Sequence, residues 1–426
     1  MCSSSTFSTS PPPEGTLVVQ TWFFTEDAYP YLPDPSQYES IRVNLPNRNY
    51  DPAKGADLYH QYLDMWLAAE AHGLEIMVNE HHQTATCVVP AAPLMLAILA
   101  RQSKTARLLI LGNPIANRNQ PVRVAEEMAM IDVISRGRLE CGFVRSVPWE
   151  ASAANISALR GADRMWEAHD LIIKAFTTHD GPFNFEGRYY HHRQVNIWPR
   201  PYQQPHPPIW VTIGSGPSGV PVAQRNYIGA VFLAGYQKVR SIFDGYREGY
   251  AAKFARPAPI DRLAYAALIY VGDTPKLARE GAEKILWYMQ SNKVTPHHSN
   301  PPGYHPPDIA VQFMKGAAGI LPMAPQLDDQ MARGNVFAGT PDQVYEQIKS
   351  LYDYSGGFGH LIMMGQAGFL SMPETLRSME LFSKEVAPRL KALTASYAHD
   401  RAQEVRAALP DKPLTALGSF GLEFVR

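Results

Sequence analysis

The residues best suited to chemistry form one short run, the segment NEHHQ at positions 79–83. It directly follows an apolar stretch at 74–78 that is typical of a short buried strand. The ordinary pKa of imidazole lies near neutral pH, so His81 and His82 are suited to moving protons. In parallel barrels, functional side chains gather at the carboxyl ends of strands. The position therefore favours proton chemistry at an active-site rim, with a hydrogen-bonded structural histidine as the alternative.

A glycine-rich turn is the second candidate site. It consists of Gly214, Ser215, Gly216, Pro217 and Ser218. Small residues let backbone N–H groups approach an anion, and the N-terminus of the following helix adds a partial positive charge. The spacing also matches the dinucleotide-binding pattern GxGxxG, but the next strand, ending near Phe232, lacks the acidic residue that would bind a ribose. We interpret the turn as a mononucleotide phosphate site, with a plain glycine-rich turn as the alternative.

Two further strand ends carry candidate residues. Arg145 follows a predicted strand at 138–144, where its guanidinium could pair with the same phosphate. An arginine in a surface ion pair is the alternative. Gly112 ends a predicted strand at 107–112, before Asn113, and a glycine there permits the close approach of a flat ligand. A simple strand-ending turn is the alternative for this position.

These residues must be positioned by a regular alternation of short apolar strands and amphipathic helices. The strands are predicted at 17–23, 74–78, 107–112, 138–144, 209–213, 228–232, 263–271 and 359–364. The helices are predicted at 57–72, 91–103, 122–134, 217–226, 238–254, 274–292, 341–353 and 373–393. Such strand–helix units favour an α/β fold, a closed (β/α)8 TIM barrel, over an open doubly wound sheet.

Three long insertion loops interrupt this alternation, at 25–56, 179–208 and 293–339. The second contains a predicted hairpin, in which strands around 183–185 and 189–190 flank a turn. Loops that follow strands lie on the catalytic face of a barrel, so the first and third are expected to cover a substrate.

Composition sets the broad class. The 426 residues are 45% hydrophobic and 19% charged, which is typical of a globular protein with a large core. A net charge of −1 and the absence of a long basic run argue against nucleic acid or a membrane surface as a partner. Without a signal peptide or an apolar span, the protein is expected to be cytoplasmic. We expect a disordered tail at 1–15, the barrel at 16–393 and a C-terminal extension at 394–426.

The sequence gives little sign of metal chemistry. The pairs His191–His192 and His297–His298 lack a carboxylate at ligand spacing. Adjacent residues in extended backbone point opposite ways, which argues against His81 and His82 sharing one ion. Three scattered cysteines form neither a zinc pattern nor a disulfide framework. We therefore predict no metal site.

Taken together, the motifs resemble those of the bacterial luciferase-like flavin-dependent monooxygenases. The strongest block comprises NEHH at 79–82, QPVRVAEE at 120–127, IDVISRGR at 131–138 and GFVR at 142–145. Later family segments are matched at 214–218, 338–341 and 385–388. The likeness runs from about 17 to 393, and its spacing is specific.

The resemblance implies a TIM barrel that uses FMN, supplied reduced by a separate flavin reductase, and molecular oxygen. Such an enzyme oxidises a small organic substrate through a flavin peroxide. By position, His81 matches the histidine that assists proton transfer, and Arg145 and the 214–218 turn match phosphate-contacting positions. Gly112 and Asn113 match a strand end beneath the flavin ring, where family members often have a non-prolyl cis peptide. The 293–339 segment matches a mobile lid.

The chain departs from the family pattern at two positions. Ser146 stands where a glycine often follows the arginine, and Asn113 replaces the small residue of luciferase itself, which argues against light emission. Trp22, near the first loop, indicates an apolar or aromatic substrate pocket, which His82 is also expected to line. Core packing is the alternative for the aromatic residues of this strand.

Two other functions stay open on the same barrel. One is a deazaflavin-dependent oxidoreductase that transfers hydride without oxygen, and the other is a non-catalytic flavin-binding protein. The absence of a second nucleotide site predicts that a partner reductase delivers the flavin. Because barrels of this family often dimerise, a homodimer or another homo-oligomer is expected.

Overall fold

The computed structural model describes residues 18–291 and 325–397, together with 294, 296–299, 305–307 and 311. The predicted tail at 1–15 lies outside the described residues, as do residues 398–426 of the predicted extension and much of the predicted 293–339 lid.

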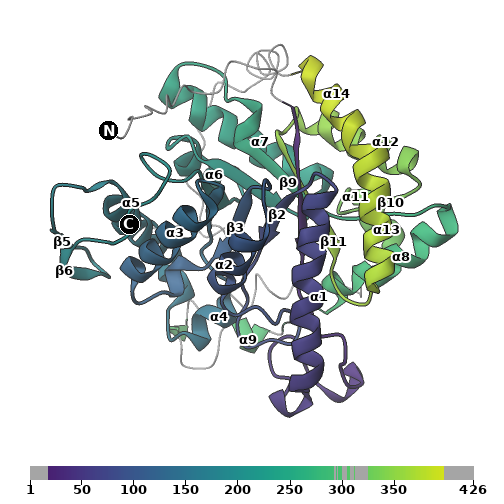
Figure 1. The fold of residues 1–426 in the computed structure, drawn as a ribbon, viewed down its shortest axis with the longest axis horizontal. Helices are drawn as coiled ribbons and strands as arrows, with labels where there is room; N and C mark the ends of the chain where they lie inside the picture. The colour runs from purple at the N-terminus through teal and green to yellow at the C-terminus, as the bar shows by residue number, and fades with distance from the viewer. Residues whose placement is uncertain are drawn as a thin grey trace, which may run out of the picture.

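Eight parallel strands close into a barrel that is wrapped by helices (Figure 1). Their order is β1, β2, β3, β4, β7, β8, β9 and β11, and β11 pairs with β1 to complete the circle. Their bounds are β1 (Gln20–Thr25), β2 (Glu75–Val78), β3 (Leu108–Asn113), β4 (Leu139–Phe143), β7 (Ile209–Thr212), β8 (Ile228–Phe232), β9 (Leu263–Val271) and β11 (His360–Gln366). The predicted (β/α)8 TIM barrel is confirmed.

Helices fill the intervals between the strands, as predicted. They are α1 (Pro52–Ala71), α2 (Ala92–Gln102), α3 (Pro121–Ser135), α6 (Gly216–Ala223), α7 (Gly235–Phe254), α8 (Pro275–Gln290), α12 (Pro341–Ser355), α13 (Met372–Leu381) and α14 (Ala387–Tyr397). The first helix begins earlier than expected, because the Asp51 side chain accepts the N–H groups of Ala53 and Lys54 and Pro52 suits the first helical position.

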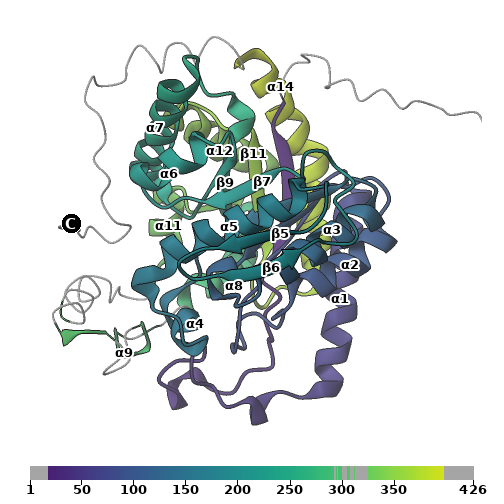
Figure 2. The same ribbon diagram turned by 90° about the vertical axis from the view of Figure 1, so that its left-hand side faces the viewer.

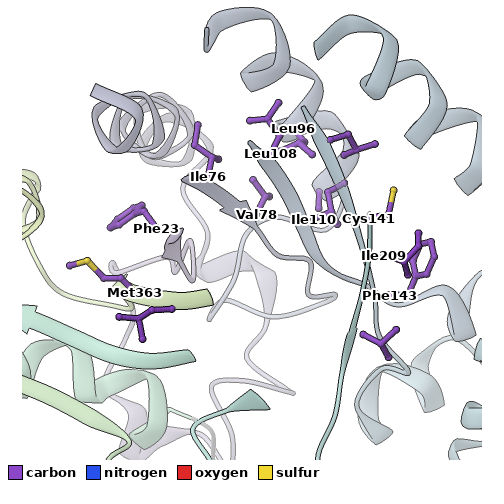
Figure 3. Packing of buried hydrophobic residues seen from close by; sticks show 14 of the residues in the cluster. Phe23, Ile76, Val78, Leu96, Leu108, Ile110, Cys141, Phe143, Ile209 and Met363 are labelled. Atoms are coloured by element: carbon purple, nitrogen blue, oxygen red, sulfur yellow. The ribbon is translucent and has the colours of Figure 1, made fainter. Parts of the chain in front are cut away.

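Both faces of the barrel strands are buried, which explains why their sequences are apolar throughout. Alternate residues point outward to a layer between strands and helices, shown in Figure 3 around Ile76, Ile110 and Cys141. The residues between them point into the barrel, where Phe24 and Met77 belong to a second apolar cluster. This two-sided core fixes the positions of the strand ends.

The chain contains elements that the sequence patterns did not predict. They are α4 (Pro148–Ala153), α5 (Gly161–Thr177), α11 (Leu327–Arg333) and β10 (Val336–Gly339). The last two fall in the segment predicted as a lid, and β10 pairs in parallel with the second half of β9. The described part of 293–339 is therefore partly regular structure.

The predicted hairpin is present as β5 (Phe183–Glu186) and β6 (His191–Val195). Its second strand starts later than predicted. The backbone N–H groups of Tyr189 and Tyr190 donate to the Glu167 carboxylate at 2.7 and 2.8 Å, so these two residues form part of the turn.

Three segments gather at one end of the barrel, where the strands have their carboxyl ends. They are the 25–56 loop, the short helix α4 and the short helix α9 (Pro296–Ser299) (Figures 1 and 2). The loop contains two 3-10 turns, η1 (Pro35–Gln37) and η2 (Asn47–Asn49). Among the described residues, no helix combines the length and apolarity needed to cross a membrane.

Candidate active site

His81 is held by a carboxylate on one side and an arginine on the other. Its Nδ1 lies 2.7 Å from Oε1 of Glu150, a residue of α4 that is only 4% exposed. The ring's other nitrogen, Nε2, lies 3.4 Å from the Arg42 guanidinium. An ionised carboxylate can only accept, so Nδ1 carries the proton, and in the neutral ring Nε2 faces Arg42 as an acceptor. The contacts therefore select one tautomer of His81.

A second carboxyl group faces the same imidazole. Glu26, which follows β1 directly, has Oε1 at 3.7 Å from His81 Nε2 and at 3.8 Å from Arg42. Its Oε2 accepts a hydrogen bond of 3.1 Å from the Asn79 side chain. Burial raises the pKa of Glu26, and the charges of His81 and Arg42 oppose this shift only in part. Glu26 therefore keeps its proton to a higher pH than an ordinary glutamate does.

Glu150 is shifted in the opposite direction. Burial alone would raise its pKa, but the hydrogen bond and charge of His81, together with the backbone N–H and charge of His82, outweigh burial, and the pKa is lowered. Two carboxyl groups whose pKa values move apart therefore flank one imidazole. Such divergence is the arrangement that separates an acid from a base in enzyme sites, so this cluster can store and relay a proton.

Asp27 adds a second buried acid next to Glu26. Both of its carboxylate oxygens are buried without a hydrogen-bond partner among the described residues. Burial, together with the charge of Glu26, raises the pKa of Asp27 well above its ordinary value of 3.8. Its backbone is in the left-handed region, with φ of 54°. Ionised Asp27 is therefore expected to destabilise the fold.

We expect the variant Asp27→Asn to be more stable than the wild-type protein at pH 8, with a smaller difference at pH 4. With a raised pKa the folded state binds more protons than the unfolded state, so wild-type stability falls as pH rises above 3.8. Each pKa unit is worth about 1.4 kcal/mol. Asparagine also tolerates positive φ. Urea unfolding at both pH values measures the effect, and a gain independent of pH would contradict this explanation.

His82 is directed to a different partner. Its Nε2 lies 2.9 Å from Glu80, which also accepts the backbone N–H of Ala92 at 3.0 Å and pairs with Arg118 at 2.5 Å. Its side chain is 27% exposed. The two adjacent imidazoles thus have different partners, although the backbone N–H of His82 also donates to Glu150 Oε1, at 3.4 Å. A contact between His82 and a substrate stays a prediction.

Trp22, predicted to line the substrate pocket, lies in the interior of the barrel. It is 0% exposed, donates its indole N–H to His360 Nδ1 at 3.2 Å, and meets Trp210 edge to face. It precedes Glu26 by four residues along the strand, which corresponds to ~13 Å at about 3.3 Å per residue. Trp22 is therefore packed inside the barrel, below the rim that carries His81, and a contact between Trp22 and a substrate stays a prediction.

The end of β3 contains a non-prolyl cis peptide, between Leu111 and Gly112. It lies one bond before the Gly112–Asn113 step at which the family resemblance places such a bond. A side chain at Gly112 is excluded, because its Cβ would lie 2.1 Å from Val144 Cγ1. Asn113 is 1% exposed, and neither polar atom of its side chain has a hydrogen-bond partner among the described residues.

The glycine-rich turn forms the N-terminus of α6. Ser215 and Ser218 form a capping box, and Ser218 Oγ accepts the N–H groups of Gly214 at 3.2 Å and Ser215 at 3.0 Å. Gly214 is exposed, and no heavy atom lies within 4 Å of the position that its Cβ would take. The turn is therefore rigid and accessible.

Arg145 lies at the end of β4, which pairs with β7, the strand leading into this turn. Its side chain packs against the first residue of α5, since a Cβ on Gly161 would lie 3.0 Å from Arg145 Cγ. Burial lowers the pKa of Arg145. The arginine and the turn thus occupy neighbouring strand ends.

The sequence patterns did not point to four residues of this site, which are Glu26, Asp27, Arg42 and Glu150. The two consecutive acids begin three residues after the predicted end of the first strand at Phe23, so the strand-end argument applied to residues 79–83 could have found them. Arg42 and Glu150 lie in a loop and a short helix, where no periodic pattern points to them.

Comparison with known proteins shows which protein family this chain resembles. A model of the luciferase-like monooxygenase family matches residues 41–357. The chain is 31% identical over 176 residues to the oxygenase component of flavin-dependent trigonelline monooxygenase from Acinetobacter baylyi, covering 40% of this chain and 48% of that protein. The chain thus spans about half of that relative.

A second relative aligns over a longer part of the chain, and its name gives F420 as its cofactor. F420-dependent glucose-6-phosphate dehydrogenase from Segniliparus rotundus is 26% identical over 347 residues, covering 78% of this chain and 94% of that protein. Among solved structures, the oxygenating constituent of 3,6-diketocamphane monooxygenase from Pseudomonas putida, in complex with FMN, has a TM-score of 0.66 at 21% identity. That match covers 88% of this chain and 99% of the solved chain. The chain therefore belongs to the luciferase-like monooxygenase family of oxidoreductases.

Proposed function

We propose that this protein is an FMN-dependent monooxygenase that uses reduced flavin and molecular oxygen to oxidise a small organic substrate. The observation that carries the proposal is the His81 cluster, a single-tautomer imidazole between two carboxyl groups at the carboxyl-end rim of the barrel. Bound reduced flavin supplies the electrons that activate oxygen. The chain's own residues hold the cofactor, exclude water and move the proton.

The residues at the rim fit a flavin mononucleotide. The open space at Gly214 and the N-terminus of α6 suit a phosphate, and Arg145 on the adjacent strand end supplies a positive charge. For the flat ring of a flavin, Gly112 offers backbone without a side chain, and the side chain of buried Asn113 has polar atoms that no described residue hydrogen-bonds. We assign Arg145 and the 214–218 turn to the phosphate and Gly112 and Asn113 to the ring.

Within this site, His81 is the residue that accepts and donates the proton. Glu150 holds the proton on Nδ1, which leaves Nε2 to accept or return a proton on its other side. The Arg42 guanidinium lies 3.4 Å from Nε2. The carboxyl group of Glu26, whose pKa is raised, lies 3.7 Å from the same nitrogen and can supply the proton. The 25–56 loop, which carries Arg42, lies over the same end of the barrel and so restricts the access of water (Figure 2).

The test is anaerobic titration with reduced FMN, followed by mixing with oxygen while the flavin absorbance is recorded. Saturable binding and a delayed return of oxidised flavin, slower than for free flavin, support the proposal. Tight binding with immediate reoxidation argues against oxygenase chemistry. Failure to bind FMN at all contradicts the assigned cofactor.

The second candidate is a deazaflavin-dependent hydride-transfer enzyme. It is favoured by the match to F420-dependent glucose-6-phosphate dehydrogenase, which extends over 94% of that protein. Parallel titrations with F420 and FMN separate the two candidates. Tighter binding of F420, together with reduction of its deazaflavin by an alcohol without oxygen, would place the second candidate first.

The phosphate assignment predicts a selective effect of Arg145. The variant Arg145→Gln should bind FMN about 10- to 100-fold more weakly, because one charge-assisted contact is typically worth about 1.5–3 kcal/mol. Riboflavin, which has no phosphate, should bind wild type and variant equally. Fluorescence titration with both flavins measures this. An equal loss for both would show that Arg145 supports the fold of the rim and does not bind the phosphate.

Partners follow from the same proposal. A separate reductase supplies the reduced FMN, and a second copy of this chain is proposed to cover an apolar patch on α2 and α3. The patch consists of Leu94, Ile98, Met130, Val133 and Ile134, each at least 40% exposed. Exposed apolar side chains on two helices that contact each other suit an association surface, so we propose a homo-oligomer, with a homodimer as its simplest form.

A further inference from the structure

We propose that Glu39, His297 and His298 form a binding site for a divalent transition-metal ion of the zinc class. Glu39 lies in the 25–56 loop, and the two histidines lie in α9, which comes from a distant part of the chain. Their ligand atoms, one from each residue, all lie within 4.8 Å of one another. The ion would link two segments that come together only in the folded protein.

The distances are close to those of a metal centre. His297 Nε2 lies 3.3 Å from Glu39 Oε1, and His298 Nε2 lies 3.7 Å from Glu39 Oε2. In a tetrahedral site with bonds of about 2.0–2.1 Å, neighbouring ligand atoms are roughly 3.3–3.5 Å apart. Both carboxylate–imidazole distances therefore lie within a few tenths of an ångström of this value. The two imidazole nitrogens lie within 4.8 Å of each other and would have to approach by up to about 1.5 Å to bind one ion.

The donor set selects the class of ion. Two imidazoles and one carboxylate are borderline ligands that suit zinc and its neighbours, and they are a poor match for calcium or magnesium, which prefer oxygen ligands. Three protein ligands leave a fourth position for water. Access for this water exists, because the His297 side chain is 54% exposed and that of Glu39 is 46% exposed.

The side chain of Asn44 contacts two of the three proposed ligands, Glu39 and His298. Its side-chain Nδ2 donates to Glu39 Oε2 at 3.4 Å and lies 3.5 Å from His298 Nε2, while its Oδ1 accepts the backbone N–H of Ser40 at 3.1 Å. Hydrogen bonds to a ligating carboxylate fix its orientation. The amide thus already orients Glu39 toward the two imidazoles.

The sequence prediction of no metal site rested on the lack of a carboxylate near either histidine pair along the chain. The fold supplies that carboxylate from the first loop, so ligand spacing in the sequence could not reveal it. The second pair, His191–His192, gives the contrast. There His191 Nδ1 lies 3.3 Å from Glu186 Oε2, but the described residues bring no further imidazole into a ligand cluster with them.

The location links the proposed ion to the His81 cluster. Glu39 precedes Arg42 by three residues, and Arg42 lies 3.4 Å from His81 Nε2. On the other side, α9 packs against α4, which carries Glu150. An ion here would therefore tie together the two segments that hold His81, as a structural clip beside the active site.

The experiment is calorimetric titration of the full-length, tag-free, chelator-treated protein with Zn²⁺, in the absence of any flavin. We expect one high-affinity ion per chain, and Co²⁺ should give the visible absorption of a four-coordinate site. The variants Glu39→Gln, His297→Ala and His298→Ala should each weaken binding by at least about 10- to 100-fold, the range seen even for supporting residues. Asn44→Ala should cause a smaller loss.

The matched control is His191→Ala, which removes an exposed histidine with a similar carboxylate contact and should leave the affinity unchanged. Thermal unfolding of each metal-free variant checks that its fold is intact. The proposal is overturned if wild type binds no ion, which would make the cluster an ordinary ion pair. Equal affinity in the three ligand variants would overturn it as well. Because the titration contains no flavin, its failure is distinguishable from a failure of the proposed function.

Discussion

Replacing His81 with alanine is expected to lower the rate of product formation by about 10²- to 10⁴-fold, the usual contribution of a positioned acid–base group, while FMN still binds. The expectation follows from the geometry, because His81 is the only imidazole of the described rim that contacts both Glu150 and Glu26. Alanine removes the group that moves the proton and leaves the proposed phosphate site, on β4 and β7, intact.

The measurement is a coupled assay with a flavin reductase and a substrate found by screening the wild-type enzyme. Product and hydrogen peroxide are both quantified for each reduced flavin consumed. In the His81 variant, most of the electrons should leave as hydrogen peroxide. The matched control is His191→Ala, which removes an exposed imidazole of the β5–β6 hairpin and should leave the product yield unchanged. Unchanged product yield in the His81 variant would show that the proton is managed elsewhere.

The barrel was predictable because its physical signal is repeated. Each strand is a short apolar run buried on both faces, and each strand is followed by an amphipathic helix, so errors at single positions do not change the fold class. The helix α5 was missed although Met165, Leu171, Ile172 and Phe176 are buried on one face. It lies in a long interval between strands that contains two helices and a hairpin, where a simple strand–helix alternation does not apply.

The site was predictable only in part. Residues that directly follow a strand, such as His81 and Arg145, are placed by the strand itself, and the rule that barrel sites lie at carboxyl ends of strands finds them. Arg42 and Glu150 reach the same imidazole from a loop and a short helix, through contacts between residues far apart in sequence. Their positions depend on loop packing, which leaves no period or spacing in the chain. The proximity of Glu39 to His297 and His298 could not be predicted from the sequence for the same reason.

Glu150→Gln should lower the turnover number by about 10- to 100-fold, as expected when the orienting partner of a reacting histidine is lost. Glu150 is a positioning residue, since it contacts Nδ1 of His81 at 2.7 Å and acts through that ring. An ionised carboxylate can only accept a hydrogen bond, whereas the glutamine amide can also donate one. The variant therefore no longer selects the tautomer with the proton on Nδ1.

Two measurements separate this positioning role from a merely structural one. Nitrogen-15 NMR of the His81 ring should show one tautomer in the wild-type protein and a mixture in Glu150→Gln. The pH dependence should change as well. The pKa of Glu150 is lowered from 4.5, so its stabilising contribution is present above that value and is lost as pH falls through the folded-state pKa. The glutamine variant should lack this loss.

The conservative variant Glu150→Asp completes the test, because it keeps the carboxylate on a shorter side chain. It should restore the Nδ1 tautomer and part of the turnover, while Glu150→Gln restores neither. If both variants lost activity equally and the tautomer of His81 were unchanged in both, the carboxylate would serve only to pack α4 against the rim. The proton would then be directed by Arg42 and Glu26, which face the opposite nitrogen of the ring.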